Sequence, residues 1–131
     1  MIYLDSTAVV KLVHAETGSR ALRDWLAQRA ETGWVSSALT EVEVFRALVR
    51  HAPEAVFRLP TFLDLVQLVE IDAGIRSMTR LVQPPTVRTT NAVHLGTALR
   101  LGDQLTSFVT YDRQLANAAE TAGLTVDRPT H

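Results

Sequence analysis

Residues 2–13 read IYLDSTAVVKLV and join a short apolar run to a helix-like segment through a single acid. The run Ile2–Leu4 is typical of a buried strand, and Asp5 follows it directly. Ser6 belongs to the residue types that cap helices, so we expect a helix from Ser6 to about Val13. A strand, an acid and a helix in immediate succession form the first unit of a parallel sheet wrapped by helices.

The rest of the chain repeats this alternation. Further strands are expected at Trp34–Ser36, Val66–Ile71, Ser107–Thr110 and Leu124–Val126. Further helices are expected from Ser19, from Ser37 to about Arg50, from Pro53 with an interruption at Pro60, from Asp72 to about Leu81, over Thr90–Leu101 and over Asp112–Ala122. The sequence therefore predicts an α/β fold, in which a parallel sheet of about five short strands is wrapped by about seven helices.

Two finer expectations concern the third helix and the end of the chain. Ala38, Val42, Phe45 and Val49 recur at helical spacing, so we expect them on one face of the helix. The last residues, 128–131, lie beyond the final strand and are expected to be loose.

Composition and length narrow the class of protein. The chain has 131 residues, 47% of them hydrophobic, which predicts one packed domain over residues 1–131. A net charge of −1 argues against nucleic-acid binding by bulk charge alone, although a local basic groove stays possible. The chain has no cysteine, and we see neither a signal peptide nor a membrane span, so we expect a cytoplasmic protein.

Acids follow the predicted strands at the edge where open parallel sheets bind ligands. Asp5 and Asp112 each come after a strand, and the helix after WVSS carries Glu41 and Glu43. Carboxylates gathered there repel one another unless a cation holds them, and hard oxygen ligands suit Mg²⁺ or Mn²⁺. Periodicity does not choose between Glu41 and Glu43.

Each acid also has a purely structural interpretation. Asp5 and Asp112 are good caps for the helices that follow them, and Glu43 is spaced to pair with Arg46 at i,i+3. From the residues alone, the pattern indicates an acidic site and leaves these alternatives open.

Other catalytic patterns are absent or incomplete. The chain has no GxxxxGK[ST] phosphate loop and no GxSxG elbow. The four histidines, His14, His51, His94 and His131, lack zinc-ligand spacing, and His94 is expected to be a packed or hydrogen-bonded helix residue. LDSTA is similar to phosphatases with an Asp nucleophile, but Thr7 replaces their second Asp and the chain's one lysine, Lys11, lies inside the first helix.

The segment RTTNAVHLGTAL, residues 88–99, raises a separate question. Thr90 or Asn91 could cap the helix that starts there. On a helical wheel, however, Asn91 falls in line with Leu95 and Ala98 on the apolar side, where a cap has no reason to point.

Taken together, four segments resemble PIN-domain ribonucleases of the VapC toxin kind. They are MIYLDSTAVVKL, VSSALTEVEVFRAL, RTTNAVHLGTALRLG and FVTYDRQLANAAETAGL, and the match covers nearly the whole chain. The resemblance places the second acid at Glu43 and a usual aspartate at Asn91. It implies a PIN-like α/β/α sandwich.

The resemblance also implies an activity and partners. It implies a Mg²⁺- or Mn²⁺-dependent endoribonuclease, an RNA substrate, a VapB-like antitoxin, and a homodimer or a larger toxin–antitoxin assembly. Asp5 and Asp112 would be the principal metal ligands, Glu43 would bind or orient metal-bound water, and Asn91 would complete the site. The hydroxyls of Ser6 and Thr110 would support the carboxylates, and Arg46 and Arg113 are candidates for contact with RNA phosphates.

Asn91 carries no charge where the resemblance implies a carboxylate, so metal affinity and water activation should be weaker. Natural divergence and an introduced Asp→Asn change, which would spare a host cell from a toxic ribonuclease, are the two explanations. The sequence also leaves other functions open. The main alternative is a catalytically silent PIN-like protein that binds RNA or its antitoxin. A metal-dependent phosphatase is a third hypothesis.

Overall fold

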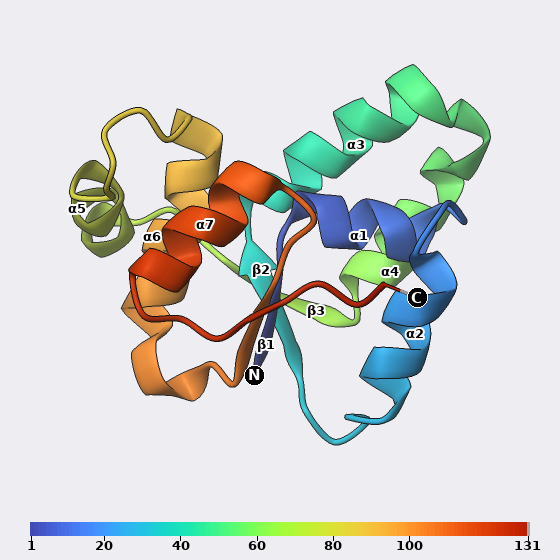
Figure 1. Ribbon diagram of the computed structural model, residues 1–131. Helices are drawn as coiled ribbons and strands as arrows, with labels where there is room; N and C mark the ends of the chain where they lie inside the picture. Colours follow the sequence, from blue (N-terminus) through green and yellow to red (C-terminus); the bar gives the residue numbers. More distant parts are fainter. Residues whose placement is uncertain (131) are drawn as a thin grey trace.

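The computed structural model describes residues 1–130, and His131, within the end expected to be loose, lies outside the described residues. Five parallel strands form one sheet in the order β3-β2-β1-β4-β5 (Figure 1). They are β1 (Ile2–Leu4), β2 (Trp34–Ser37), β3 (Val66–Val69), β4 (Ser107–Val109) and β5 (Val126–Asp127). The predicted strand positions are therefore confirmed to within a few residues.

Seven α-helices and two short 3₁₀ helices in residues 1–130 connect these strands. The α-helices are α1 (Ser6–Val13), α2 (Ser19–Ala27), α3 (Leu39–His51), α4 (Leu59–Leu63), α5 (Ala73–Arg80), α6 (Thr89–Leu101) and α7 (Arg113–Thr121). The 3₁₀ helices are η1 (Pro53–Arg58) and η2 (Gly102–Gln104). Pro60 lies in the first turn of α4, where a missing N–H costs nothing, so the predicted interruption falls between η1 and α4.

The strand order reverses beside β1. The chain runs outward from β1 to β2 and β3, then crosses back to place β4 on the other side of β1. Leu4 is in register with Val109, so Asp5 and Thr110, the next residues along each strand, emerge side by side. In open α/β sheets, the carboxyl ends of strands at such a reversal are where ligands bind.

Helices cover both faces of the sheet, and β1 shows why. Ile2 and Leu4 pack into one core with α1, α2 and the inner side of α3, while Tyr3 points to the other face. There it packs with α6, α7 and β4, as the two groups of helices on either side of the strands in Figure 1 illustrate. Alternation of side chains along a strand thus builds an α/β/α sandwich, as predicted.

Helices α1 and α2 begin at the predicted residues, but their capping residues and the start of α3 differ from the prediction. Asp5, and not Ser6, caps α1, because its side chain accepts the Ala8 N–H. Gly18, in the left-handed region with φ of 89°, is the N-cap residue of α2, which begins at Ser19 as predicted. Ser37 is the last residue of β2, and α3 begins only at Leu39.

The apolar face of α3 noted in the sequence is not the buried face of the helix. Thr40, Val44 and Leu48 are the buried residues of this helix. Val42 and Phe45 are 53% and 49% exposed. The apolar residues of α3 form two stripes, and the sequence does not say which one meets the core of its own chain.

The chain's end is partly anchored. The Tyr111 hydroxyl donates a 2.8 Å hydrogen bond to the carbonyl of Pro129, so the predicted looseness does not extend over all of residues 128–130. Within residues 1–130, none of the helices has the length and apolar character needed to cross a bilayer.

Candidate functional site

Asp5 is held at the carboxyl end of β1 by short polar contacts. Its Oδ1 accepts hydrogen bonds from the Thr7 hydroxyl at 2.6 Å and the Ala8 N–H at 3.0 Å. Its Oδ2 accepts one from the Thr110 hydroxyl at 2.5 Å. The side chain is 2% exposed, so these donors replace the water that a carboxylate needs.

Burial nevertheless raises the pKa of Asp5 above its ordinary value. The nearby His94 and the hydrogen bonds from Thr110, Thr7 and Ala8 act in the opposite direction but do not cancel the effect of burial. Burial disfavours the ionised form of this carboxylate, and a nearby cation would stabilise it.

Asp112 lies next to Asp5 through a shared hydroxyl. Thr110 Oγ1 donates to Asp5 and accepts the Asp112 N–H at 3.0 Å. The Oδ1 atom of Asp112 caps α7 by accepting the Leu115 N–H at 2.9 Å. Its Oδ2 atom pairs with the Arg88 guanidinium at 2.8 Å. The capping alternative is therefore correct for Asp112, and one oxygen also binds a cationic group.

Glu43 reaches the same edge from α3. Its Oε1 accepts hydrogen bonds from the Ser6 hydroxyl and from His94, whose Nε2 lies 2.7 Å away. Burial opposes its charge, but the hydrogen bonds from His94 and Ser6 and the positive charge of Arg88 outweigh it, so the pKa of Glu43 lies below its ordinary value. Glu43 makes no ion pair with Arg46 among the described residues, so the i,i+3 alternative is wrong.

Asn91 does not cap α6. The helix begins at Thr89 with Arg88 as its N-cap residue, and no side chain caps it, so Asn91 is its third residue. Its side chain is 8% exposed, and its Nδ2 donates a 3.1 Å hydrogen bond to Gln114 Oε1. The helical wheel predicted that Asn91 lies on the inward side of the helix, and this is confirmed. The alternative, that Thr90 or Asn91 caps the helix, is wrong.

The structure brings most of the predicted site residues together. Ser6 and Thr110 contact Glu43 and Asp5, as expected of supporting hydroxyls. Arg46 and Arg113 are exposed, and neither makes an ion pair within residues 1–130, so their contact with phosphate stays a prediction. Glu41 is exposed and lies outside this network, whereas Glu43 lies within it.

Sequence reasoning missed several members of the network. They are Tyr3, Thr7, Arg88 and Gln114, together with the contact of His94 with Glu43. Thr7 had a detectable signal, because a hydroxyl two residues after an acid commonly bonds back to it. Arg88, Gln114 and Tyr3 had none, because their partners lie 24, 23 and 91 positions away in the chain.

The donor chemistry at this edge suits a hard divalent cation. Asp5, Glu43 and Asp112 supply carboxylate oxygens, and Asn91 supplies an amide. The Arg88 guanidinium already pairs with Asp112 and lowers the pKa of Glu43, so the edge attracts positive charge. Among residues 1–130, no three acidic, histidine or cysteine side chains are arranged as a ready-made metal site.

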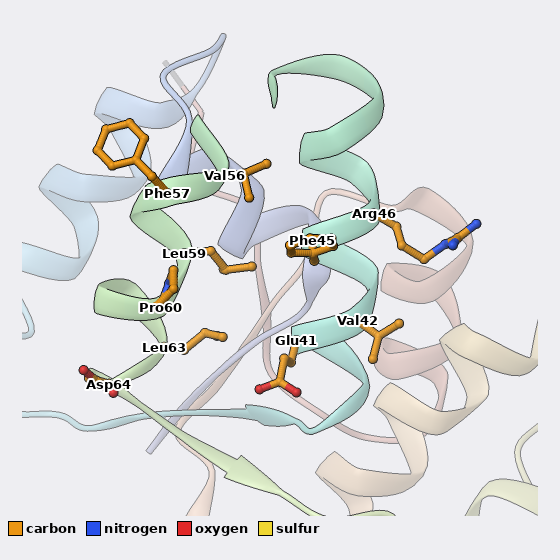
Figure 2. A pocket seen from close by; sticks show the side chains of 10 residues that line it. All are labelled: Glu41, Val42, Phe45, Arg46, Val56, Phe57, Leu59, Pro60, Leu63 and Asp64. Carbon is orange, nitrogen blue, oxygen red and sulfur yellow. The ribbon is translucent and has the colours of Figure 1, made fainter. Parts of the chain in front are cut away.

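A second feature is an apolar groove beside α3. Figure 2 shows the side chains of α3 facing those of η1 and α4 across it. Its volume is about 700 Å³, and it is lined by Glu41, Val42, Phe45, Arg46, Val56, Phe57, Leu59, Pro60, Leu63 and Asp64. Phe57 is 73% exposed, so aromatic and aliphatic surface is open along it. Exposed apolar surface of this kind is typical of protein- and ligand-binding sites.

Comparisons with known proteins agree with this fold. The PIN domain family model matches residues 2–121. The chain is 45% identical to Ribonuclease VapC35 of Mycobacterium tuberculosis over 131 residues, which span 98% of this chain and 97% of that protein.

Solved structures share the fold at low sequence identity. The crystal structure of VapC20 of Mycobacterium tuberculosis, a Sarcin-Ricin loop cleaving toxin, superposes with a TM-score of 0.77 at 16% identity and covers 98% of this chain and 100% of that one. A chain of VapBC2 from Rickettsia felis, bound to a DNA fragment from the promoter, gives a TM-score of 0.75 at 12% identity. It covers 98% of this chain and 99% of its own.

Proposed function

Because this chain belongs to the PIN-domain family, and within it to the VapC ribonucleases, we propose that it cleaves RNA with the help of a divalent cation held by Asp5, Glu43 and Asp112. It is an endoribonuclease toxin of a VapBC toxin–antitoxin pair. The single sheet with cores on both faces supports treating residues 1–131 as one domain. RNA as substrate and a chain without cysteine both favour action in the cytoplasm.

One observation carries the catalytic proposal. Two hydroxyls link residues of three separate segments at the strand-order reversal: Thr110 bonds the Asp5 carboxylate and the Asp112 backbone N–H, and Ser6, the neighbour of Asp5, bonds Glu43. Mg²⁺ or Mn²⁺, bound there, would stabilise charge on a phosphoryl oxygen and activate water. Asp5 and Asp112 would be its main ligands, Glu43 would bind it or orient its water, and Asn91 would contribute a weaker amide oxygen.

The chain's own residues have defined tasks in this proposal. Thr7 and Thr110 orient the Asp5 carboxylate from opposite sides. Ser6 restrains one oxygen of Glu43, and the other has no hydrogen-bond partner within residues 1–130. Arg46 and Arg113, both exposed, are proposed to meet RNA phosphates, for which a guanidinium is well suited.

For the antitoxin, we propose the apolar groove of Figure 2 as the binding surface. A VapB-like segment with apolar residues on one helix face would bury Val42, Phe45 and Phe57. Arg46 lines the groove and Glu43 lies three residues before it on α3, so a bound segment would run beside the proposed catalytic edge. A homodimer and a larger assembly with the antitoxin are proposals as well, tested by the mass of each complex in solution.

A second function has its own support. Asn91 lacks the charge of a carboxylate, and Arg88 neutralises Asp112, so the edge carries less negative charge than three free acids and an aspartate would supply. A silent PIN-like protein that binds RNA or antitoxin without cleavage would have these features. Both natural divergence and an introduced Asp→Asn change remain explanations of Asn91.

The deciding experiment is an RNA-cleavage assay with Mn²⁺ or Mg²⁺ on this chain, on Asn91→Asp, and on Asn91→Asp with Asp5→Ala. Cleavage by the first two that is lost in the third supports the ribonuclease. Cleavage that persists unchanged in the third refutes the proposed site. RNA binding without metal, and no cleavage by either of the first two, favours the silent form.

A further inference from the structure

Tyr3 and His94 form a buried polar pair inside the core between the sheet and α6. Their side chains are 0% and 2% exposed, and Tyr3 Oη lies 2.8 Å from His94 Nδ1. The tyrosine ring stacks on Phe108 with centroids 4.9 Å apart and meets the imidazole edge-on at 84°. A phenylalanine and a leucine would fill this space without the free-energy cost of burying two polar groups. The polar contact between Tyr3 and His94 therefore points to a role other than packing.

The hydrogen bond between them has a defined direction. The Tyr3 side chain has no exposed surface, so its hydroxyl needs a hydrogen-bond partner within the protein. The hydroxyl lies 2.8 Å from His94 Nδ1, and we take the phenol as the donor, because the other ring nitrogen, Nε2, faces a carboxylate oxygen and so carries the ring proton. A neutral imidazole that accepts at Nδ1 carries its own proton on Nε2.

The Nε2 atom points at the proposed metal site. It lies 2.7 Å from Glu43 Oε1, and the Ser6 hydroxyl, 3.2 Å from Nε2, donates to the same oxygen. Two donors thus converge on Oε1, and within residues 1–130 Oε2 has none. The carboxylate is fixed with one oxygen restrained and the other available.

From this geometry we propose that Tyr3 and His94 are positioning residues for Glu43: the phenol sets the imidazole tautomer, and the imidazole holds Oε1 so that Oε2 is the oxygen offered to a divalent cation. This inference rests on the proposed function, since it gives Glu43 a ligand's task. Partners of this kind, one bond removed from a metal, typically change metal affinity by about 10–100-fold when they are lost.

The experiment first reads the tautomer in the metal-free protein. With ¹⁵N-labelled histidine, NMR distinguishes a proton on Nε2 from one on Nδ1, and the His94 signal is assigned by its absence from His94→Gln. We expect Nε2–H in the unmodified chain and a mixture of tautomers in Tyr3→Phe. A proton fixed on Nδ1, or an unchanged signal in Tyr3→Phe, overturns the relay.

The second reading is Mn²⁺ affinity by calorimetry, in this chain and in the Asn91→Asp background. His94→Leu removes the donor at similar volume, His94→Gln keeps an amide donor, and Glu43→Gln removes the charge. We expect the Mn²⁺ Kd to rise about 10–100-fold in His94→Leu and to stay within about threefold in His94→Gln. Tyr3→Phe should give an intermediate value and keeps the test valid if His94→Leu does not fold.

The outcomes separate the two levels of the proposal. If Glu43→Gln weakens Mn²⁺ binding and His94→Leu leaves it unchanged, the positioning role is wrong and the proposed function stands. If Glu43→Gln changes nothing, or no variant binds Mn²⁺ in either background, the assignment of Glu43 as a ligand is wrong, and the positioning role falls with it.

Discussion

Asn91 and Gln114 are joined by a 3.1 Å hydrogen bond from the amide nitrogen of Asn91 to the side-chain oxygen of Gln114. Gln114 Oε1 also accepts the backbone N–H of Arg88 at 3.2 Å, so one amide links the first turns of α6 and α7. The hydrogen bond between residues 91 and 114 depends on a donor at position 91. An aspartate there would meet the Gln114 oxygen as a second acceptor, and the glutamine would have to turn its NH₂ toward it.

The first prediction concerns Asn91→Asp. An added carboxylate at this buried position, which Gln114 links to the Arg88 backbone, should raise Mn²⁺ affinity by about tenfold or more, equivalent to about 1.4 kcal/mol of binding free energy. RNA cleavage should rise in parallel, because the proposed cation then has a full set of charged ligands. Calorimetry and a cleavage time course measure the two effects on the same preparations.

The matched control for that prediction is Asn117→Asp, on the exposed side of α7. It adds the same charge away from the site and should change neither Mn²⁺ affinity nor cleavage. Equal effects of the two substitutions would mean that general charge, and not position 91, is responsible.

The second prediction concerns Arg88→Ala. The guanidinium occupies Asp112 Oδ2 at 2.8 Å and competes there with any cation, so its removal should raise Mn²⁺ affinity in the absence of RNA. The Arg88 side chain is 68% exposed, and the loss of such a pair should change the free energy of unfolding by no more than about 1 kcal/mol. Arg113→Ala, which removes an exposed arginine outside this ion pair, is the control for overall charge. Equal or lower Mn²⁺ affinity in Arg88→Ala would show that the arginine does not compete.

The positions of Asp5 and Asp112 followed from the sequence because they depend on local signals. An apolar run followed by an acid gives both a strand end and a helix cap, and both acids do cap helices. Parallel strands then bring these ends to one edge, whatever the strand order. The network around them did not follow, because His94 meets Glu43 across 51 positions of the chain.

The face of α3 shows a different limit. Both Val44 and Phe45 belong to apolar stripes at helical spacing, and burial depends on which side meets the sheet. In the structure, the stripe with Val44 is buried, and Phe45 in the other stripe is 49% exposed. A surface used by a partner carries the same apolar pattern as a core, so a single sequence cannot separate the two.

The third prediction compares the two faces of that helix. Leu48→Ala, at a site 1% exposed, should lower the free energy of unfolding by about 2–5 kcal/mol, because it leaves a cavity in the core. Phe45→Ala, on the outer face, should change it by no more than about 0.5–1 kcal/mol. Phe45→Ala should instead weaken the binding of the antitoxin. Urea unfolding and a binding titration with the antitoxin separate these effects, and full antitoxin affinity in Phe45→Ala would argue against the groove.

The fourth prediction concerns the pH dependence of stability at Asp5. Burial raises the pKa of Asp5 in the folded state, so its contribution to stability is complete below its ordinary pKa and is lost as pH rises through the raised value. Asn at position 5 does not titrate. We therefore expect Asp5→Asn to gain stability relative to the unmodified chain as pH rises from about 4 to 7, without metal.

Urea unfolding of both proteins across this pH range gives the difference directly, since every other acid titrates in both. A difference that stays constant with pH, or that moves against Asp5→Asn on going to neutral pH, would contradict a raised pKa. Asp5→Asn should be inactive throughout, because it removes a proposed ligand.

The last prediction concerns the contact of α5 with α6, the helix that carries Asn91 and His94. A Cβ added to Gly96 would lie 2.5 Å from Thr79 Oγ1 and 2.9 Å from the Thr79 backbone nitrogen. The Thr79 hydroxyl donates a 2.8 Å hydrogen bond to the Ile75 carbonyl, and the Thr79 backbone cannot move without the rest of α5. Gly96→Ala should therefore push the two helices apart and lower the free energy of unfolding by about 1–3 kcal/mol.

Gly33→Ala, where an added Cβ meets nothing within 4 Å, should be close to neutral. Since a displaced α6 also moves Asn91 and His94, Gly96→Ala should weaken Mn²⁺ binding as well, and a variant with both stability and Mn²⁺ affinity unchanged would show that α5 does not fix the position of α6.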